Sequence, residues 1–70
     1  MTEIRAEIAA TVWKVEVSQG QAVAENDELI VLESMKMEIP VVATASGTVA
    51  EVHVGPDDRV NESDLLVTLS

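Results

Sequence analysis

The sequence repeats itself when the chain is shifted against itself by 37 positions, and no gap is needed. The matched pairs are Thr11 with Thr48, Val12 with Val49, Val15 with Val52, Val17 with Val54, Val23 with Val60, Glu25 with Glu62, Asp27 with Asp64, Leu29 with Leu66 and Leu32 with Leu69. Repetition at a fixed spacing indicates one structural unit used twice. We therefore expect a single domain over 1–70, with units 3–32 and 40–69 joined by the segment 33–39.

Both units show the alternation of apolar and polar residues that is typical of β-strands. In the first unit Trp13, Val15 and Val17 alternate with Lys14 and Glu16, and in the second the apolar positions are Ala50, Val52 and Val54. Turn-forming residues follow each alternating stretch, at 18–21 and at 55–58, and an apolar run comes next, at 29–32 and at 65–69. The sequence therefore predicts an all-β fold.

Two like units, each with one open apolar face, can bury those faces against each other about a pseudo-twofold axis. The expected architecture is a flattened β-barrel or sandwich. The linker keeps residues 32 and 40 close, so the symmetry should bring their equivalents, residues 69 and 3, together at the other end. Lys36, in the middle of the linker, should then lie far from both termini.

Local propensity disagrees with this scheme over 28–39, which is rich in Leu, Met, Glu and Lys and would favour a helix in isolation. The equivalent of 29–32 in the second unit contains Val67 and Thr68, which favour a strand. We therefore expect 33–39 to form a tight hairpin. Because the hairpin has neither Gly nor Asn, we also expect backbone strain at Met35-Lys36.

Composition excludes several classes of protein. Thirteen acidic residues against four basic ones give a formal charge of −9, which disfavours binding to nucleic acid or to anionic lipid. The charge predicts a soluble monomer, with a basic docking partner as the alternative. The absence of cysteine suits a reducing compartment. The start of the chain does not resemble a secretory signal and no stretch is long enough to span a membrane, so we expect a cytoplasmic location.

One lysine, flanked by two methionines, lies at the centre of the hairpin segment Glu33-Ser34-Met35-Lys36-Met37-Glu38. Its amine, on a flexible stem, can form an amide with the carboxyl group of a cofactor and tether it. An exposed hairpin would let several enzymes reach this amine. No pairing of a nucleophile with a base is evident, and His53 has no Cys or second His nearby, so neither a catalytic nor a metal site is expected.

With these features the sequence resembles the biotinyl/lipoyl attachment domains, and specifically the biotin carboxyl carrier branch with its Met-Lys-Met core. The resemblance covers nearly the whole chain, from the turn at Gly20 through the hairpin to Gly47-Thr48-Val49. It implies a carrier without catalytic residues of its own and with biotin on Lys36, joined through biotinyl-adenylate by a biotin protein ligase. The ligase would recognise Met35 and Met37, with Glu33, Ser34 and Glu38 as secondary contacts.

The same resemblance implies two further partners: a biotin carboxylase that uses ATP and bicarbonate, and a carboxyltransferase that receives the carboxyl group. Two positions depart from the family pattern, since Gln21 replaces a common Asp and Asp57 replaces a Gly. The lipoyl branch usually carries Asp-Lys-Ala at the tip, which this sequence lacks. A lipoyl carrier and an unmodified β adaptor, with Lys36 incidental, remain the alternatives.

Several residues also have simpler structural interpretations. Met35 and Met37 could fill apolar gaps, and Glu33 and Glu38 could serve only solubility. Trp13 lies in phase with Val15 and Val17, so we expect it in or beside the core, with a docking surface as the alternative. Gly20 and Gly47 are expected at turns or close contacts rather than in a phosphate-binding loop, and Asp57-Asp58 in a solvated turn.

Overall fold

A computed structural model describes residues 1–70, and it consists of eight β-strands connected by turns. The strands are β1 (Thr2–Arg5), β2 (Ala10–Val15), β3 (Ala22–Val23), β4 (Glu28–Ser34), β5 (Met37–Val42), β6 (Gly47–Val52), β7 (Arg59–Val60) and β8 (Leu65–Leu69). The all-β prediction is confirmed. The structure contains no helix of the length and apolar character needed to cross a membrane.

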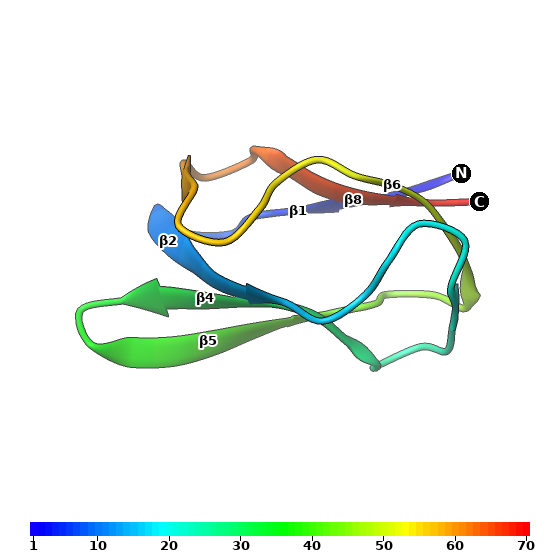
Figure 1. The fold of residues 1–70 in the computed structure, drawn as a ribbon, viewed down its shortest axis with the longest axis horizontal. Helices are drawn as coiled ribbons and strands as arrows, with labels where there is room; N and C mark the ends of the chain where they lie inside the picture. The colour runs from blue at the N-terminus through cyan, green and yellow to red at the C-terminus, as the bar shows by residue number, and fades with distance from the viewer.

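The strands form two four-stranded sheets, ordered β1-β8-β6-β3 and β5-β4-β2-β7, and every pairing within them is antiparallel. The sheets lie one above the other in an elongated molecule whose principal extents are 31 × 17 × 17 Å (Figure 1). The two repeat units do not form one sheet each. Unit 3–32 contributes β1 and β3 to the first sheet and β2 and β4 to the second, so the two halves interlock.

The pseudo-twofold symmetry extends to the register of individual residues. Leu32 pairs with Ile39, and the equivalent Leu69 pairs with Thr2. The two sheets also have equivalent strand orders, because β1, β6, β8 and β3 correspond to β5, β2, β4 and β7. Residue 3 pairs with residue 68, next to residue 69, as the sequence predicted. The symmetry prediction is confirmed.

A β-bulge interrupts β2 and makes one prediction wrong. Val12 pairs with Leu32 and Lys14 pairs with Val31, so Trp13 is an extra residue between two rungs of the ladder. The bulge ends the strict alternation of faces. Val12 is fully buried, whereas Trp13 is 44% exposed and does not enter the core. The second half has the same irregularity in β6, where Ala50 occupies the position of Trp13.

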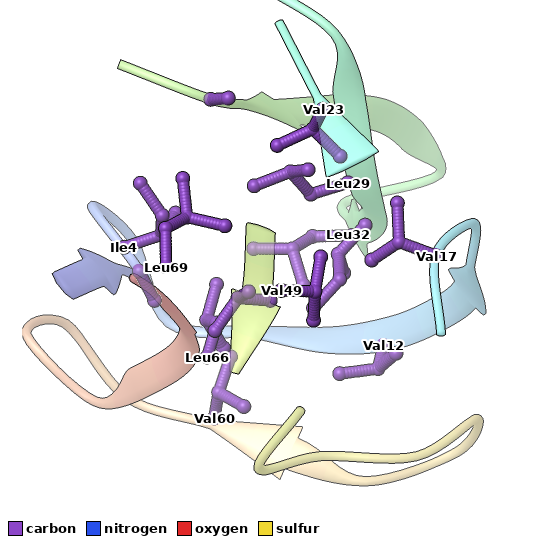
Figure 2. Packing of buried hydrophobic residues seen from close by; sticks show 14 of the residues in the cluster. Ile4, Val12, Val17, Val23, Leu29, Leu32, Val49, Val60, Leu66 and Leu69 are labelled. Atoms are coloured by element: carbon purple, nitrogen blue, oxygen red, sulfur yellow. The ribbon is translucent and has the colours of Figure 1, made fainter. Parts of the chain in front are cut away.

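The core is a single cluster between the sheets, built from aliphatic side chains of both halves (Figure 2). Its members are Ile4, Ala6, Ala10, Val12, Val17, Val23, Leu29, Ile30, Leu32, Ala43, Val49, Val60, Leu66, Val67 and Leu69. Val15 and Val52 are only partly buried but pack against it, so their inward placement is confirmed. The core contains no aromatic side chain, and its stability depends on close packing of branched aliphatic residues.

Equivalent turns keep their geometry although their residues differ. Gly20 has a φ of 90° and Asp57, its equivalent, has a φ of 73°, so Asp57 adopts the expected left-handed conformation. The Gln21 Oε1 atom accepts a hydrogen bond from the Ser18 N–H at 3.2 Å, as Asp58 Oδ2 accepts one from the Gly55 N–H at 2.8 Å. The amide oxygen of Gln21 therefore accepts the hydrogen bond that an aspartate carboxylate accepts in the equivalent turn. Asp57-Asp58 is exposed, as expected, and closes its turn as well.

Core truncations should be ranked by burial. Val12→Ala removes two methyl groups from a fully buried site and leaves a cavity, so it should lower the free energy of unfolding by about 2–3 kcal/mol. Val15→Ala, at a partly buried site, should cost about 1 kcal/mol. Val49→Ala and Val52→Ala in the second half should show the same order. Urea unfolding followed by circular dichroism measures all four, and a Val15→Ala cost equal to that of Val12→Ala would contradict the assignment.

Candidate functional site: the Lys36 hairpin

The candidate site is the turn between β4 and β5. The ladder continues to its last rung, where Ser34 pairs with Met37, and Met35-Lys36 makes the reversal. The prediction of a hairpin over 33–39 is therefore confirmed, and the helix favoured by local propensity does not form. Leu29, Ile30 and Leu32 all enter the core from β4, and this burial outweighs the propensity of the isolated segment.

Both turn residues adopt the left-handed backbone conformation. Met35 has a φ of 52° and Lys36 a φ of 65°, the pattern of a type I′ turn, whose twist matches that of the flanking strands. Neither residue is Gly or Asn, so each position stores strain of roughly 1 kcal/mol. The expected strain is confirmed. It is maintained because five consecutive rungs of pairing with β5, from Ile30–Val41 to Ser34–Met37, and the burial of β4 hold both ends of the turn.

The six residues of the hairpin motif lie together at this tip. Lys36 is exposed, and so are Met35 at 92% and Met37 at 67%. The methionines therefore do not fill gaps in the core. Ser34 is half-buried opposite Met37. Figure 1 places this turn at one end of the long axis and both termini at the other, as the repeat predicted.

The two lysines of the chain are in different environments. The Lys14 ammonium lies 3.7 Å from Glu16 Oε1 and 4.4 Å from the centroid of the Trp13 ring. The other ion pairs of the structure join Arg5 with Glu3 and His53 with Glu51. Lys36 takes part in no ion pair or side-chain hydrogen bond. An enzyme can therefore reach the Lys36 amine without first breaking an ion pair or a hydrogen bond.

The carboxylates nearest the turn face each other. Glu33 of β4 is in register with Glu38 of β5, both are exposed, and no cation of the chain lies within 4 Å of either. Like charges directly opposite each other on a ladder are destabilising. The tip therefore combines one free amine, two exposed thioethers and an uncompensated pair of carboxylates.

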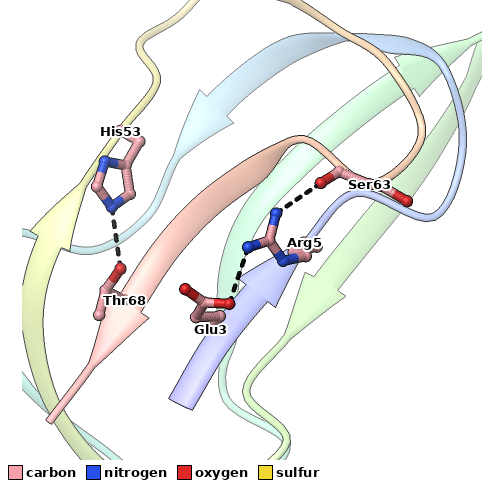
Figure 3. A network of polar contacts seen from close by, with 5 residues as sticks. All are labelled: Glu3, Arg5, His53, Ser63 and Thr68. Carbon is pink, nitrogen blue, oxygen red and sulfur yellow. Dashed lines mark hydrogen bonds and ion pairs between the residues drawn. The ribbon is translucent and has the colours of Figure 1, made fainter. Parts of the chain in front are cut away.

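The remaining polar candidates lie away from the tip. His53 Nε2 is 2.9 Å from Thr68 Oγ1 on the outer face of the β1-β8-β6-β3 sheet (Figure 3). No group of three or more His, Cys, Asp or Glu side chains is placed to hold a metal ion. Gly47 is a close contact as expected, because a Cβ atom there would lie 2.7 Å from the Ser70 carbonyl oxygen.

The comparisons with known proteins agree with the geometry of this hairpin. A family model described as "Biotin-requiring enzyme" matches residues 2–69. The chain belongs to the biotinyl/lipoyl attachment family. It is 46% identical over 68 residues to a biotinylated protein TB7.3 homolog of Mycobacterium leprae, covering 97% of this chain and 96% of that protein.

Two further comparisons connect this biotinyl/lipoyl domain with carboxylases. It is 43% identical over 65 residues to a biotin carboxyl carrier protein of Streptococcus mutans, covering 93% of this chain and half of that protein. The crystal structure of urea carboxylase from Kluyveromyces lactis superposes with a TM-score of 0.93 at 30% identity, covering 99% of this chain and 6% of that one. The chain is thus a biotin carboxyl carrier-like domain, homologous to the biotinyl domains of carboxylases.

The strain of the turn can be tested with the two methionines. Met35→Gly should raise the free energy of unfolding, by up to about 1 kcal/mol, because glycine adopts the left-handed conformation without steric cost. Met37→Gly, the matched control in a strand, should lower it by about 1 kcal/mol. Chemical denaturation of both variants gives the comparison. Equal losses of stability in the two would show that Met35 carries no strain.

Proposed function

We propose that Lys36 is the biotin attachment site of this domain and that the attached biotin carries carboxyl groups between the sites of a carboxylase system. One observation carries the proposal: Lys36 is an exposed, unpaired amine at the tip of a strained hairpin, flanked by Met35 and Met37. The family membership of the chain supplies the cofactor class. The hairpin residues fit this group, because nothing in the fold blocks the amine or competes for it.

The attachment chemistry requires little from the domain itself. The Lys36 amine, after losing a proton, attacks the carbonyl carbon of a biotinyl-adenylate, and the new C–N bond replaces the bond to AMP, which leaves. The ligase would supply the activated carboxyl group and the base. The domain contributes the position of the amine, which the paired strands β4 and β5 hold in one place. Once attached, biotin supplies a ring nitrogen that accepts and releases carboxyl groups.

The proposal assigns roles to the neighbours of Lys36 and to the partners. Met35 and Met37 are recognised by the ligase, since both are too exposed to serve the core. Glu33, Ser34 and Glu38 make secondary contacts. A biotin carboxylase and a carboxyltransferase then use the arm, and the domain, a cytoplasmic monomer when isolated, carries no catalytic residue of its own.

The test is a comparison of two matched lysine substitutions. Lys36→Arg should abolish biotinylation and leave folding unchanged, because a guanidinium stays protonated at cellular pH and cannot attack as a neutral amine. Lys14→Arg should be labelled completely. Each protein is incubated with the ligase of its own host, ATP and biotin, and then analysed by intact mass and by streptavidin binding, with circular dichroism to verify the fold.

Biotin on the Lys36→Arg variant would remove Lys36 from the site. A folded wild type that gains no mass with its own ligase would overturn the carrier function. If protein isolated from its host carried the mass of a lipoyl group, the domain would be a lipoyl carrier and not a biotin carrier. If that protein were unmodified, the adaptor function would be the one that remains.

A further inference from the structure

The only aromatic side chain of the domain is on its surface. Trp13 is 44% exposed, although tryptophan is a large residue that proteins usually bury for the most part. The bulge in β2 places it outside the core. Covering the exposed part of this ring with another apolar surface would therefore be favourable.

Trp13 belongs to an apolar row across the outer face of the β5-β4-β2-β7 sheet. Val31 lies between Ile30 and Leu32, which both enter the core, so its side chain points to the opposite face. The neighbours of Val31 in register are Lys14 on β2 and Pro40 on β5. Pro40 also points outward, because the residues on either side of it pack against the core. Val31 itself is buried, with 5% of its surface exposed, so Trp13 and Pro40 provide the exposed part of this row. We name the surface formed by Trp13 and Pro40, with Val31 between them in the ladder, the Trp13 face.

The pseudo-symmetry provides an internal comparison for this surface. The positions equivalent to Trp13, Val31 and Pro40 are Ala50, Thr68 and Glu3, on the outer face of the other sheet. There Thr68 contacts His53, and Glu3 pairs with Arg5 at 2.8 Å (Figure 3). The two faces have the same backbone register but one is apolar and the other polar. The fold therefore does not require an apolar outer face, and the Trp13 face needs another explanation.

The charges beside the Trp13 face indicate what would cover it. The next outward-facing rung towards the turn, two residues beyond Val31 and Pro40, holds Glu33 and Glu38, opposite each other and without a cation. A partner that placed a Lys or Arg side chain at this rung would relieve their repulsion. The Lys14 ammonium lies 4.4 Å from the ring centroid, a cation–π contact that favours this orientation of the Trp13 ring.

We propose that the Trp13 face is the docking surface for the biotin carboxylase component, which presents an apolar depression bordered by basic side chains. This inference rests on the proposed function of Lys36. The face lies about four residues, roughly 14 Å, along the same sheet from Lys36. A ligase must bring the bare amine into its own active site, so its contacts centre on the tip. An enzyme that acts on the far end of the arm must hold the domain away from Lys36, and the Trp13 face is placed for that.

The test uses fully biotinylated protein, verified by intact mass, and the biotin carboxylase of the same host with ATP and bicarbonate. Trp13→Ala should raise the KM for the carrier about tenfold or more, with little change in kcat, because a buried tryptophan is a typical binding anchor. Trp13→Phe should give an intermediate KM. The same variants in unmodified form should be labelled by the ligase at the wild-type rate.

The pseudo-symmetry also supplies a matched control. The double variant Trp13→Ala/Ala50→Trp has the same composition as the wild type and moves the ring to the equivalent bulge on the other sheet. It should be as poor a carboxylase substrate as Trp13→Ala. Glu38→Gln should raise the KM and weaken its dependence on salt, since it removes one of the two facing carboxylates. Circular dichroism and melting verify the fold of each variant.

Several outcomes would overturn the docking surface. These are an unchanged KM in folded Trp13→Ala and a restored KM in the double variant. A slower ligase reaction of Trp13→Ala with a normal KM for the carboxylase would assign the face to the ligase. Loss of self-association in Trp13→Ala with an unchanged KM would assign the face to a second copy of the domain. A wild type that accepts no biotin overturns the proposed function together with this inference, whereas a labelled wild type with any of the other results overturns only the docking surface.

Discussion

The pairing of strands between the two repeats is the interaction on which the rest of the structure depends. Four of the six strand pairings, β1–β8, β4–β5, β2–β7 and β3–β6, join one half of the chain to the other. A single repeat would keep only one strand pairing, β2–β4 or β6–β8, and would leave its other strands unpaired and its apolar face open to water. Neither half can therefore be stable alone, and the core forms only when both are in register.

This interlocking also explains how the domain can hold a strained turn at its tip. The hairpin is the one place where the two repeats are joined in sequence, and β4 and β5 pair on both sides of the join. Left-handed conformations at Met35 and Lys36 are unfavourable for L-residues. They persist because the burial of β4 and its pairing with β5 determine the ends of the turn more strongly than the turn residues do. The backbone of Lys36 is thereby held at a defined point at the end of the sheet, with its side chain exposed.

The two halves are alike in backbone and different in surface. Equivalent turns retain the same hydrogen bond although one is made by Gln21 and the other by Asp58, so the same turn geometry is formed by different residues. The outer faces differ, and the apolar one lies on the sheet that carries Lys36. Because the two outer faces share one backbone register, the apolar character of the face with Trp13 is not required by the fold and is available for binding a partner.

The sequence by itself determined the features that depend on local pattern and on the repeat: the β-strands, the turns at 18–21 and 55–58, the pseudo-twofold relation and the hairpin with Lys36 at its tip. The repeat also correctly predicted a strand and hairpin over 28–39 where local propensity favours a helix, because the second copy contains Val67 and Thr68. Only the tertiary structure decided how the halves interlock and which way Trp13 points. A bulge reverses the direction of the side chains that follow it, and whether one forms depends on register with a distant strand. The odd spacing from Val12 to Val15, repeated at Val49 and Val52, was a trace of this change of phase, but strand alternation read from one segment alone could not locate it.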